Sequence, residues 1–219
     1  MRQRVVTLVL AVAVAFALLA LVPRLRSLRL PGYHQGYEPV QPIAYSHRLH
    51  AGELQMDCRY CHAGADESRH AGIPPAGTCM SCHRLIKATR AQVRAEEGAA
   101  EEEGREPRPV VSPELAKLYD ALALDPATMT PDPEKTPRPV EWLRVTRVPD
   151  FVWFDHRPHV AAGVACQSCH GPVETMERVR QVESISMGWC LTCHRNPDAA
   201  LPVGAAIAAA STDCAACHF

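Results

Sequence analysis

"YSHRLHAGELQMDCRYCHAG" at residues 45–64 returns in altered form as "FDHRPHVAAGVACQSCHGP" at residues 154–172. Each copy carries an aromatic residue, two histidines three positions apart, and then a Cys-x-x-Cys-His motif. The last part of the repeat recurs three more times without the first. This pattern indicates one chemistry used five times in a single chain.

All ten cysteines lie in Cys-x-x-Cys pairs, and a histidine directly follows each pair. With 11 histidines in 219 residues, chance would produce five such coincidences with odds of about one in a few million. Two thiols three positions apart can add to the two vinyl groups on one haem edge, and the adjacent histidine then reaches the iron. The spacing therefore predicts five covalently attached haem c groups. The predicted attachment residues are Cys58, Cys61, Cys79, Cys82, Cys166, Cys169, Cys190, Cys193, Cys214 and Cys217, and the predicted proximal ligands are His62, His83, His170, His194 and His218.

Two other uses of cysteine pairs fit less well. A zinc ribbon also uses Cys-x-x-Cys, but it explains neither the odd number of pairs nor the five histidines. A disulfide framework explains only the even cysteine count.

Six histidines remain for the distal side of the irons. The pairs His47/His50 and His156/His159 would each project from one face of a helical turn, so each pair can bind two neighbouring haems. His70 shortly precedes the second motif and is a fifth candidate, whereas His34 lies outside the repeat and is not expected to be a ligand. Met187, three residues before Cys190, is an alternative distal ligand that would raise the potential of one haem.

Composition limits both the fold and the partners. Hydrophobic residues make up 47% of the chain but aromatic residues only 5%, so a core built from side chains alone would be thin. We expect a mainly α fold with much irregular structure, organised around the haems. The net charge of -1 gives no reason to expect nucleic-acid binding.

The amino terminus contains an uninterrupted apolar run at residues 5–22, flanked by arginines. Its 18 residues are just long enough to cross a bilayer. Residues 1–30 are therefore predicted to be a retained single-pass anchor, although a cleaved signal peptide is the alternative. Because haem is joined to c-type cytochromes on the outer side of the membrane, the rest of the chain is expected in the periplasm.

The remaining chain divides into three parts. Residues 31–87 form a dihaem segment, residues 88–149 a charged and proline-rich spacer, and residues 150–219 a trihaem segment. The Glu-rich stretch at 90–108 reads as a solvated helix or a disordered insertion of unassigned role. Ser112 and Pro113 predict the start of a short amphipathic helix. The stretch "VEWLRVTRVPDFVWF" at 140–154 is expected to form at most an edge strand or hairpin arm.

Four stretches of sequence resemble a known family. They are "GYEPVQPIAYSHRLHAGELQMDCRYCH", "SRHAGIPPAGTCMSCH", "DFVWFDHRPHVAAGVACQSCHGPVETM" and "SMGWCLTCHR". Together they resemble the pentahaem cytochrome subunit of alternative complex III, and the His-x-x-His element resembles that of the wider class III multihaem cytochromes c. The resemblance implies a respiratory-chain subunit on the periplasmic face of the inner membrane. Its partners would be an iron-sulfur subunit, a polytopic quinol-binding subunit and a cytochrome c acceptor, and it would relay electrons without substrate chemistry of its own.

Two other functions remain open. A membrane-anchored quinol dehydrogenase of the NapC/NrfH type would oxidise quinol itself, but its first haem motif usually follows the anchor closely, whereas Cys58 lies some 35 residues beyond this one. A catalytic multihaem reductase needs an iron with an open position for its substrate. Six histidines remain outside the motifs, enough to ligate all five irons, so an open position is not required. The sequence leaves open the distal ligand of each haem, the haem potentials, the order of conduction and the final acceptor.

Overall fold

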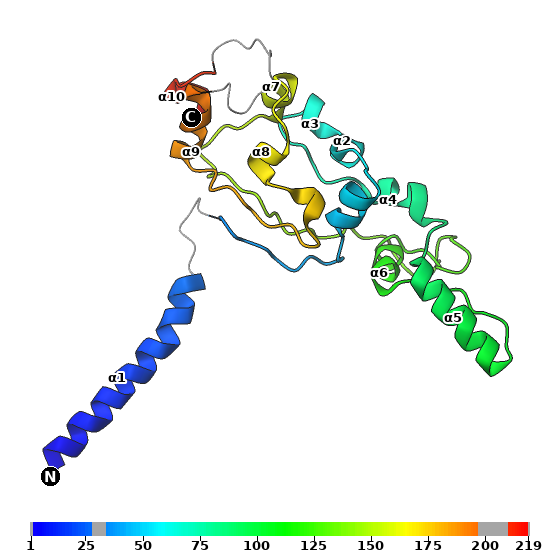
Figure 1. Cartoon of the computed structure of the whole chain (residues 1–219), viewed down its shortest axis with the longest axis horizontal. Helices are drawn as coiled ribbons and strands as arrows, with labels where there is room; N and C mark the ends of the chain where they lie inside the picture. The colour runs from blue at the N-terminus through cyan, green and yellow to red at the C-terminus, as the bar shows by residue number, and fades with distance from the viewer. Residues whose placement is uncertain (1, 28–33, 197–209, 219) are drawn as a thin grey trace.

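The structure is a computed structural model that describes residues 2–27, 34–196 and 210–218. Helix α1 (Arg2–Ser27) stands apart from a body of short helices joined by long irregular segments (Figure 1). No strand forms in these described ranges, so the expected mainly helical and irregular fold is confirmed. The ends of the predicted anchor, residues 1 and 28–30, and residues 197–209 and 219 of the predicted trihaem segment lie outside the described residues.

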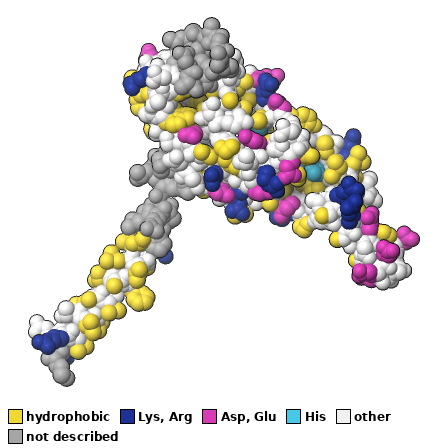
Figure 2. All heavy atoms as spheres, viewed as in Figure 1, with side chains coloured by type: hydrophobic (Ala, Val, Ile, Leu, Met, Phe, Trp, Pro, Cys, Tyr) yellow, Lys and Arg dark blue, Asp and Glu magenta, His cyan; other side chains and the backbone are white. Residues whose placement is uncertain are grey.

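Helix α1 has the length and surface of a membrane-spanning helix. Its 26 residues measure about 39 Å, against about 30 Å for the hydrocarbon core of a bilayer. Its large apolar side chains are exposed, and many of them are visible in yellow on the face of the helix that Figure 2 shows. By length and composition, the segment Arg2–Val22 can cross a membrane, a test that a signal sequence also passes.

Short helices carry the five Cys-x-x-Cys-His motifs. They are α2 (Cys58–Cys61), α4 (Ala76–His83), α8 (Gln167–His170), α9 (Met187–Arg195) and α10 (Cys214–Cys217). Polar side chains start several of them: Asp57 accepts from the Arg59 N–H, Asp213 from that of Ala215, and Ser186 from that of Trp189. One helical turn brings residues three apart onto the same side, which is the geometry that each cysteine pair needs.

The two His-x-x-His elements also form single turns, as predicted, but the turns differ. His156 and His159 lie on α7 (His156–Ala161), whereas His47 and His50 belong to a wider turn, the π-helix η1 (Arg48–Glu53), which His47 caps. The hydrogen bond from Leu54 N–H to the Leu49 carbonyl, 2.9 Å long, closes that wider turn. Two small elements pack against these turns: α3 (Gly64–Glu67) against α7, and the 3₁₀-helix η2 (Val173–Thr175) against η1.

The predicted spacer contains most of the buried apolar residues of the described chain. Helix α5 (Arg90–Glu103) begins with a capping box between Thr89 and Gln92, and ends at Gly104 with a φ of 64°. Its acidic end projects from the body (Figure 2). Helix α6 (Pro113–Ala121) starts at Ser112 as predicted, and buries Leu118 and Tyr119. The Tyr119 hydroxyl donates to the His83 carbonyl at 2.6 Å, so α6 supports the second motif directly.

The strand or hairpin arm expected at 140–154 is wrong. This segment is extended, but among the described residues it makes only the isolated bridge of Val152 with His218. Within the same segment, the backbone of Leu143 pairs with a side chain and not with a strand. Gln41 donates to the Leu143 carbonyl at 2.8 Å and accepts from its N–H at 2.9 Å. The Val, Trp and Phe residues of the segment therefore line a cavity instead of filling a sheet.

A buried glutamine joins three segments of the body. Gln181 is 1% exposed, and its backbone pairs with Gly36 (2.7 Å) and Tyr37 (3.0 Å). Its side chain accepts from the Arg147 N–H at 3.4 Å and donates to the Glu183 carbonyl at 3.0 Å. The segment that follows α1 in the sequence is thereby fixed, at residues 36 and 37, to the segment that enters α9.

Replacing Gln181 by Leu should destabilise the protein by about 2 kcal/mol, because buried backbone groups lose their partners. For a chain of this size that corresponds to a fall in Tm of about 4–8 °C in a thermal melt followed by circular dichroism. Gln41→Leu is the matched control: it also breaks two hydrogen bonds to backbone, but water can replace them, so we expect a change of about 0.5 kcal/mol or less. Equal effects of the two changes would contradict this account.

Candidate functional site: a cavity lined by five Cys-x-x-Cys-His motifs

One cavity of about 4050 Å³ extends through the body between the short helices. Cysteines and histidine of all five motifs line it, as do His47, His50, His70, His156, His159 and Met187. His34 is not among its lining residues. The cavity is several times larger than the ~300–1,000 Å³ of an ordinary small-molecule pocket, so it suits several large ligands side by side.

We number the attachment sites in chain order. Site 1 is Cys58–His62, site 2 is Cys79–His83, site 3 is Cys166–His170, site 4 is Cys190–His194 and site 5 is Cys214–His218. All ten cysteines are free thiols in the structure, which argues against the disulfide framework. In the described part of the chain, no three His, Cys, Asp or Glu side chains converge as they would around a bare metal ion.

Three pairs of histidines face each other across the cavity. The ring centroids of His50 and His83 lie 6.1 Å apart, those of His156 and His170 6.4 Å, and those of His159 and His194 6.0 Å. A metal–imidazole bond is about 2 Å long and the ring centre lies about 1 Å further back, so two imidazoles on opposite sides of one ion have centroids about 6 Å apart. The spacing fits an iron atom between the two rings at sites 2, 3 and 4.

His47 is the neighbour of His62 at site 1. Burial, together with the nearby His62 and His50, lowers the pKa of His47 to about 4. Its Nδ1 is buried and has no hydrogen-bond partner among the described residues. A neutral imidazole in this position has a lone pair available for a metal.

Site 5 is built differently. The ring stacked on His218 belongs to Phe151, at 5.8 Å and 23°, and not to a second histidine. The two remaining predicted ligands, His70 and Met187, both lie in the cavity wall. His70 follows Arg69 on a loop where its own N–H donates to Ser68, and Met187 is the first residue of α9.

In most of the histidines, a hydrogen bond between Nδ1 and a backbone carbonyl fixes the orientation of the ring. Because a carbonyl can only accept, each Nδ1 bonded to one carries the proton, and Nε2 is left free to bind a metal. The acceptors lie 2.6–2.9 Å away: Ser46 for His50, Gly72 for His62, Ile86 for His83, Arg69 for His156, Asp155 for His159 and Ser211 for His194. Residues and cavity therefore fit covalently bound haem.

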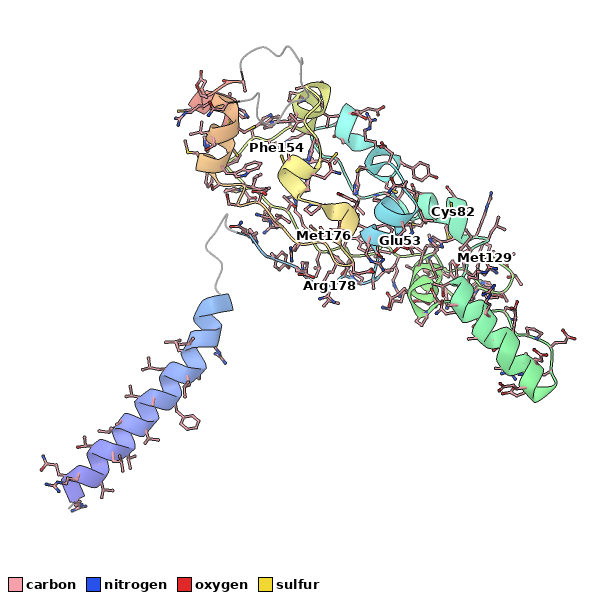
Figure 3. All side chains as sticks on the ribbon, viewed as in Figure 1. Glu53, Cys82, Met129, Phe154, Met176 and Arg178 are labelled. Carbon is pink, nitrogen blue, oxygen red and sulfur yellow. The ribbon has the colours of Figure 1, made fainter. Side chains whose placement is uncertain are left out.

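The aromatic residue at the start of each repeat, which the sequence analysis left without a role, contacts both histidines of its copy. Tyr45 meets His47 edge-on at 4.8 Å and stacks on His50 at 4.4 Å. Phe154 meets His156 edge-on at 4.8 Å and stacks on His159 at 4.9 Å. An aromatic residue stands two positions before the first histidine in both repeats, and this recurrence is the sequence signal from which the role could have been predicted. Figure 3 shows Phe154 on the α7–α9 side of the cavity and Cys82 on the α4 side.

Arg69 is a second residue that the sequence analysis missed. Its guanidinium lies 3.9 Å from the centre of the Trp153 ring and its Nε donates to the Phe154 carbonyl at 2.9 Å. Its own carbonyl accepts from the backbone N–H of His156 at 3.3 Å and from the Nδ1 at 2.9 Å. No local sequence pattern predicts that Arg69 connects these segments, because its partners are more than 80 residues away.

Comparison with known proteins supports the same class. Residues 152–219 match the family model described as cytochrome c7 and related cytochrome c. The last third of the chain is therefore cytochrome c7-like, and together with the geometry above this match supports a multihaem cytochrome c with covalently bound haem c.

A particular relative extends the likeness beyond that domain. Over 132 residues, the chain is 26% identical to the menaquinone reductase, multiheme cytochrome c subunit of Nitratidesulfovibrio vulgaris (strain Hildenborough). The match covers 59% of this chain and 45% of the relative, so it spans about half the length of that protein.

Replacing Tyr45 by Leu should change the low-spin electron paramagnetic resonance signals of the two haems at sites 1 and 2, because both distal rings lose an aromatic contact worth about 0.5–1.5 kcal/mol. Tyr45→Phe keeps the ring and should leave the spectrum unchanged. Phe154→Leu is the matched change in the other repeat and should affect sites 3 and 4 instead. Identical spectra for Tyr45→Leu and Phe154→Leu would contradict the assignment.

Proposed function

We propose that this chain is a pentahaem c-type cytochrome that relays electrons on the outer face of a quinol-oxidising membrane complex, from an iron-sulfur subunit towards a cytochrome c acceptor. The observation that carries the proposal is the set of opposed imidazoles in a cavity shared by all five motifs. The likeness to a menaquinone reductase subunit and the resemblance to the alternative complex III cytochrome supply the quinol-linked setting.

The residues have distinct parts in this function. When bound, haem c supplies a one-electron redox centre. The ten cysteines would attach the five groups, and the five motif histidines would ligate one side of each iron. His47, His50, His156 and His159 would ligate the other side at sites 1, 2, 3 and 4. If histidines of the chain held each iron from both sides, no position would remain for a substrate, which separates a relay from a catalytic reductase.

The fifth distal ligand is proposed to be His70, with Met187 as the alternative. Arg69, the residue before His70, stacks on Trp153, and the Trp153 N–H donates to the Cys217 carbonyl at 2.7 Å. The side chain of Arg69 therefore links the loop that carries His70 to Trp153, and Trp153 in turn bonds to site 5. Met187 precedes Cys190, whose pKa is raised by burial and by the neighbouring Cys217, so it also lies on the site 5 side.

Helix α1 is proposed to anchor the chain in the inner membrane, with the remainder in the periplasm. Its length and uniformly apolar, exposed surface support this placement.

Two observations bear on the alternatives. The relative is a subunit of a menaquinone reductase, which favours a second candidate function in which electrons pass through the same sites towards quinone. A quinol dehydrogenase of the NapC/NrfH type would in addition bind the quinol in this chain. Both differ from the proposal in what the purified chain does by itself.

The test uses the full-length chain purified in detergent, after a pyridine haemochrome assay has established five haems per chain. Once reduced chemically, it should pass electrons to a soluble cytochrome c, yet it should oxidise no quinol until the other membrane subunits are added. Quinol oxidation by the chain alone would favour the quinol dehydrogenase, and turnover of nitrite or hydroxylamine would favour a reductase. Quinone reduction by the assembled complex with electrons supplied at this chain would favour the second candidate.

Ligation at site 5 is tested by a pair of matched changes, His70→Leu and Met187→Leu. We expect His70→Leu to leave one of the five haems high-spin in the visible and paramagnetic resonance spectra, because one iron loses its sixth ligand. Met187→Leu should leave all five low-spin. The reverse result, together with loss of a near-infrared sulfur-to-iron charge-transfer band, would assign Met187.

A further inference from the structure

The structure contains information on which attachment sites are neighbours. Sites 1 and 2 share the turn of η1, because His50 faces His83 while His47, three residues before it, lies beside His62. Tyr45 contacts both distal rings. The Cys61 thiol of site 1 also lies near the Cys79 thiol of site 2.

Site 1 also lies against site 3. Arg69, seven residues after His62, accepts two hydrogen bonds from His156, the histidine that faces His170. Helix α3, directly after site 1, packs against α7. The Cys58 thiol of site 1 also lies beside the Cys166 thiol of site 3.

Sites 3 and 4 repeat the arrangement of sites 1 and 2. His156 faces His170 and His159, one turn further along α7, faces His194. Phe154 contacts both distal rings. The Cys169 thiol of site 3 also lies near the Cys193 and Cys190 thiols of site 4.

Site 5 adjoins site 4. The His194 Nδ1 donates to the Ser211 carbonyl at 2.6 Å, three residues before Cys214. The neighbouring thiols of Cys190 and Cys217 lie in the two sites. In Figure 1, α10 and α9 lie at one end of the body, and α8, α2 and α4 follow in that order towards the end that α5 and α6 occupy.

We infer that the five sites form a single line in the order 2–1–3–4–5, in which the first two sites of the sequence are exchanged in space. The inference rests on the proposed function only in taking each site to hold one haem. Electrons that cross the chain then pass from site 1 to site 3 directly, and site 2 is a terminus although it is second in the sequence.

The order assigns the two places where partners exchange electrons with the chain. One is site 5, on the side where residues 36 and 37, which follow the anchor, pair with Gln181 ahead of α9. The other is site 2, which Tyr119 of α6 supports and from which the spacer helices extend. Sites 1, 3 and 4 are interior positions of the relay.

The order is tested by nuclear magnetic resonance of the fully reduced, full-length chain in detergent, in which nuclear Overhauser contacts join protons of neighbouring haems. His47→Met and His50→Met change equivalent ligands on one turn, so each moves the signals of a single haem and identifies it as site 1 or site 2. We expect two haem neighbours for the haem marked by His47→Met and one neighbour for the haem marked by His50→Met. The order of the sequence predicts the opposite, and that result would overturn the inference.

A second readout covers the case in which a variant does not mature. In the unchanged protein, contacts from the thioether protons of Cys58 and Cys79 identify the same two haems, and the same count of neighbours applies. The outcome is separate from the proposed function: a chain without haems, or one that oxidises quinol by itself, contradicts the function, whereas a haem-loaded relay with contacts between sites 2 and 3 contradicts only the order.

Discussion

Imidazole rings from distant parts of the chain face each other at 6.0–6.4 Å, and this opposition is the constraint on which the body depends. One histidine of each facing pair directly follows a Cys-x-x-Cys motif, and the other lies on the separate turn η1 or α7. Each facing pair therefore sets the distance between two segments of the chain. The described chain buries few large side chains, namely Leu118, Tyr119, Met176 and Gln181, and of these only Leu118 lines the cavity. Groups held between such rings would supply the apolar contacts that a small domain normally takes from its own side chains.

Single polar contacts hold the irregular segments around the cavity. Tyr119 fixes the backbone after site 2, Gln181 fixes the chain after the anchor, and Arg69 joins the segments around sites 1, 3 and 5. Each of these contacts joins residues at least 34 apart in the sequence. Such contacts suit a chain with little regular structure, because they position backbone without requiring a sheet or a long helix.

Local features of the fold followed from the sequence, and long-range features did not. The helix beginning at Pro113 and the long apolar helix follow from capping and from hydrophobic runs, and the structure confirms them. Ten of the predicted ligand and attachment positions are cysteines whose spacing alone brings them to one side of a turn, and all of them line the cavity. The arm at 140–154 was predicted wrongly because its apolar residues were read as strand positions, when they line the cavity instead. Arg69 and Gln181 could not be predicted, since their roles depend on partners far away in the sequence. The exchange of sites 1 and 2 lies beyond local reasoning for the same reason.

The Arg69 carbonyl has a consequence for the independence of the cytochrome c7-like region. That region begins at residue 152, so it contains His156 and Trp153. It does not contain Arg69, whose carbonyl accepts from His156 and whose guanidinium stacks on Trp153. A fragment cut at this boundary would lose the acceptor that orients one of its ligands. The cytochrome c7-like region is therefore not structurally independent, because the loop that follows site 1 supplies the carbonyl that accepts from His156.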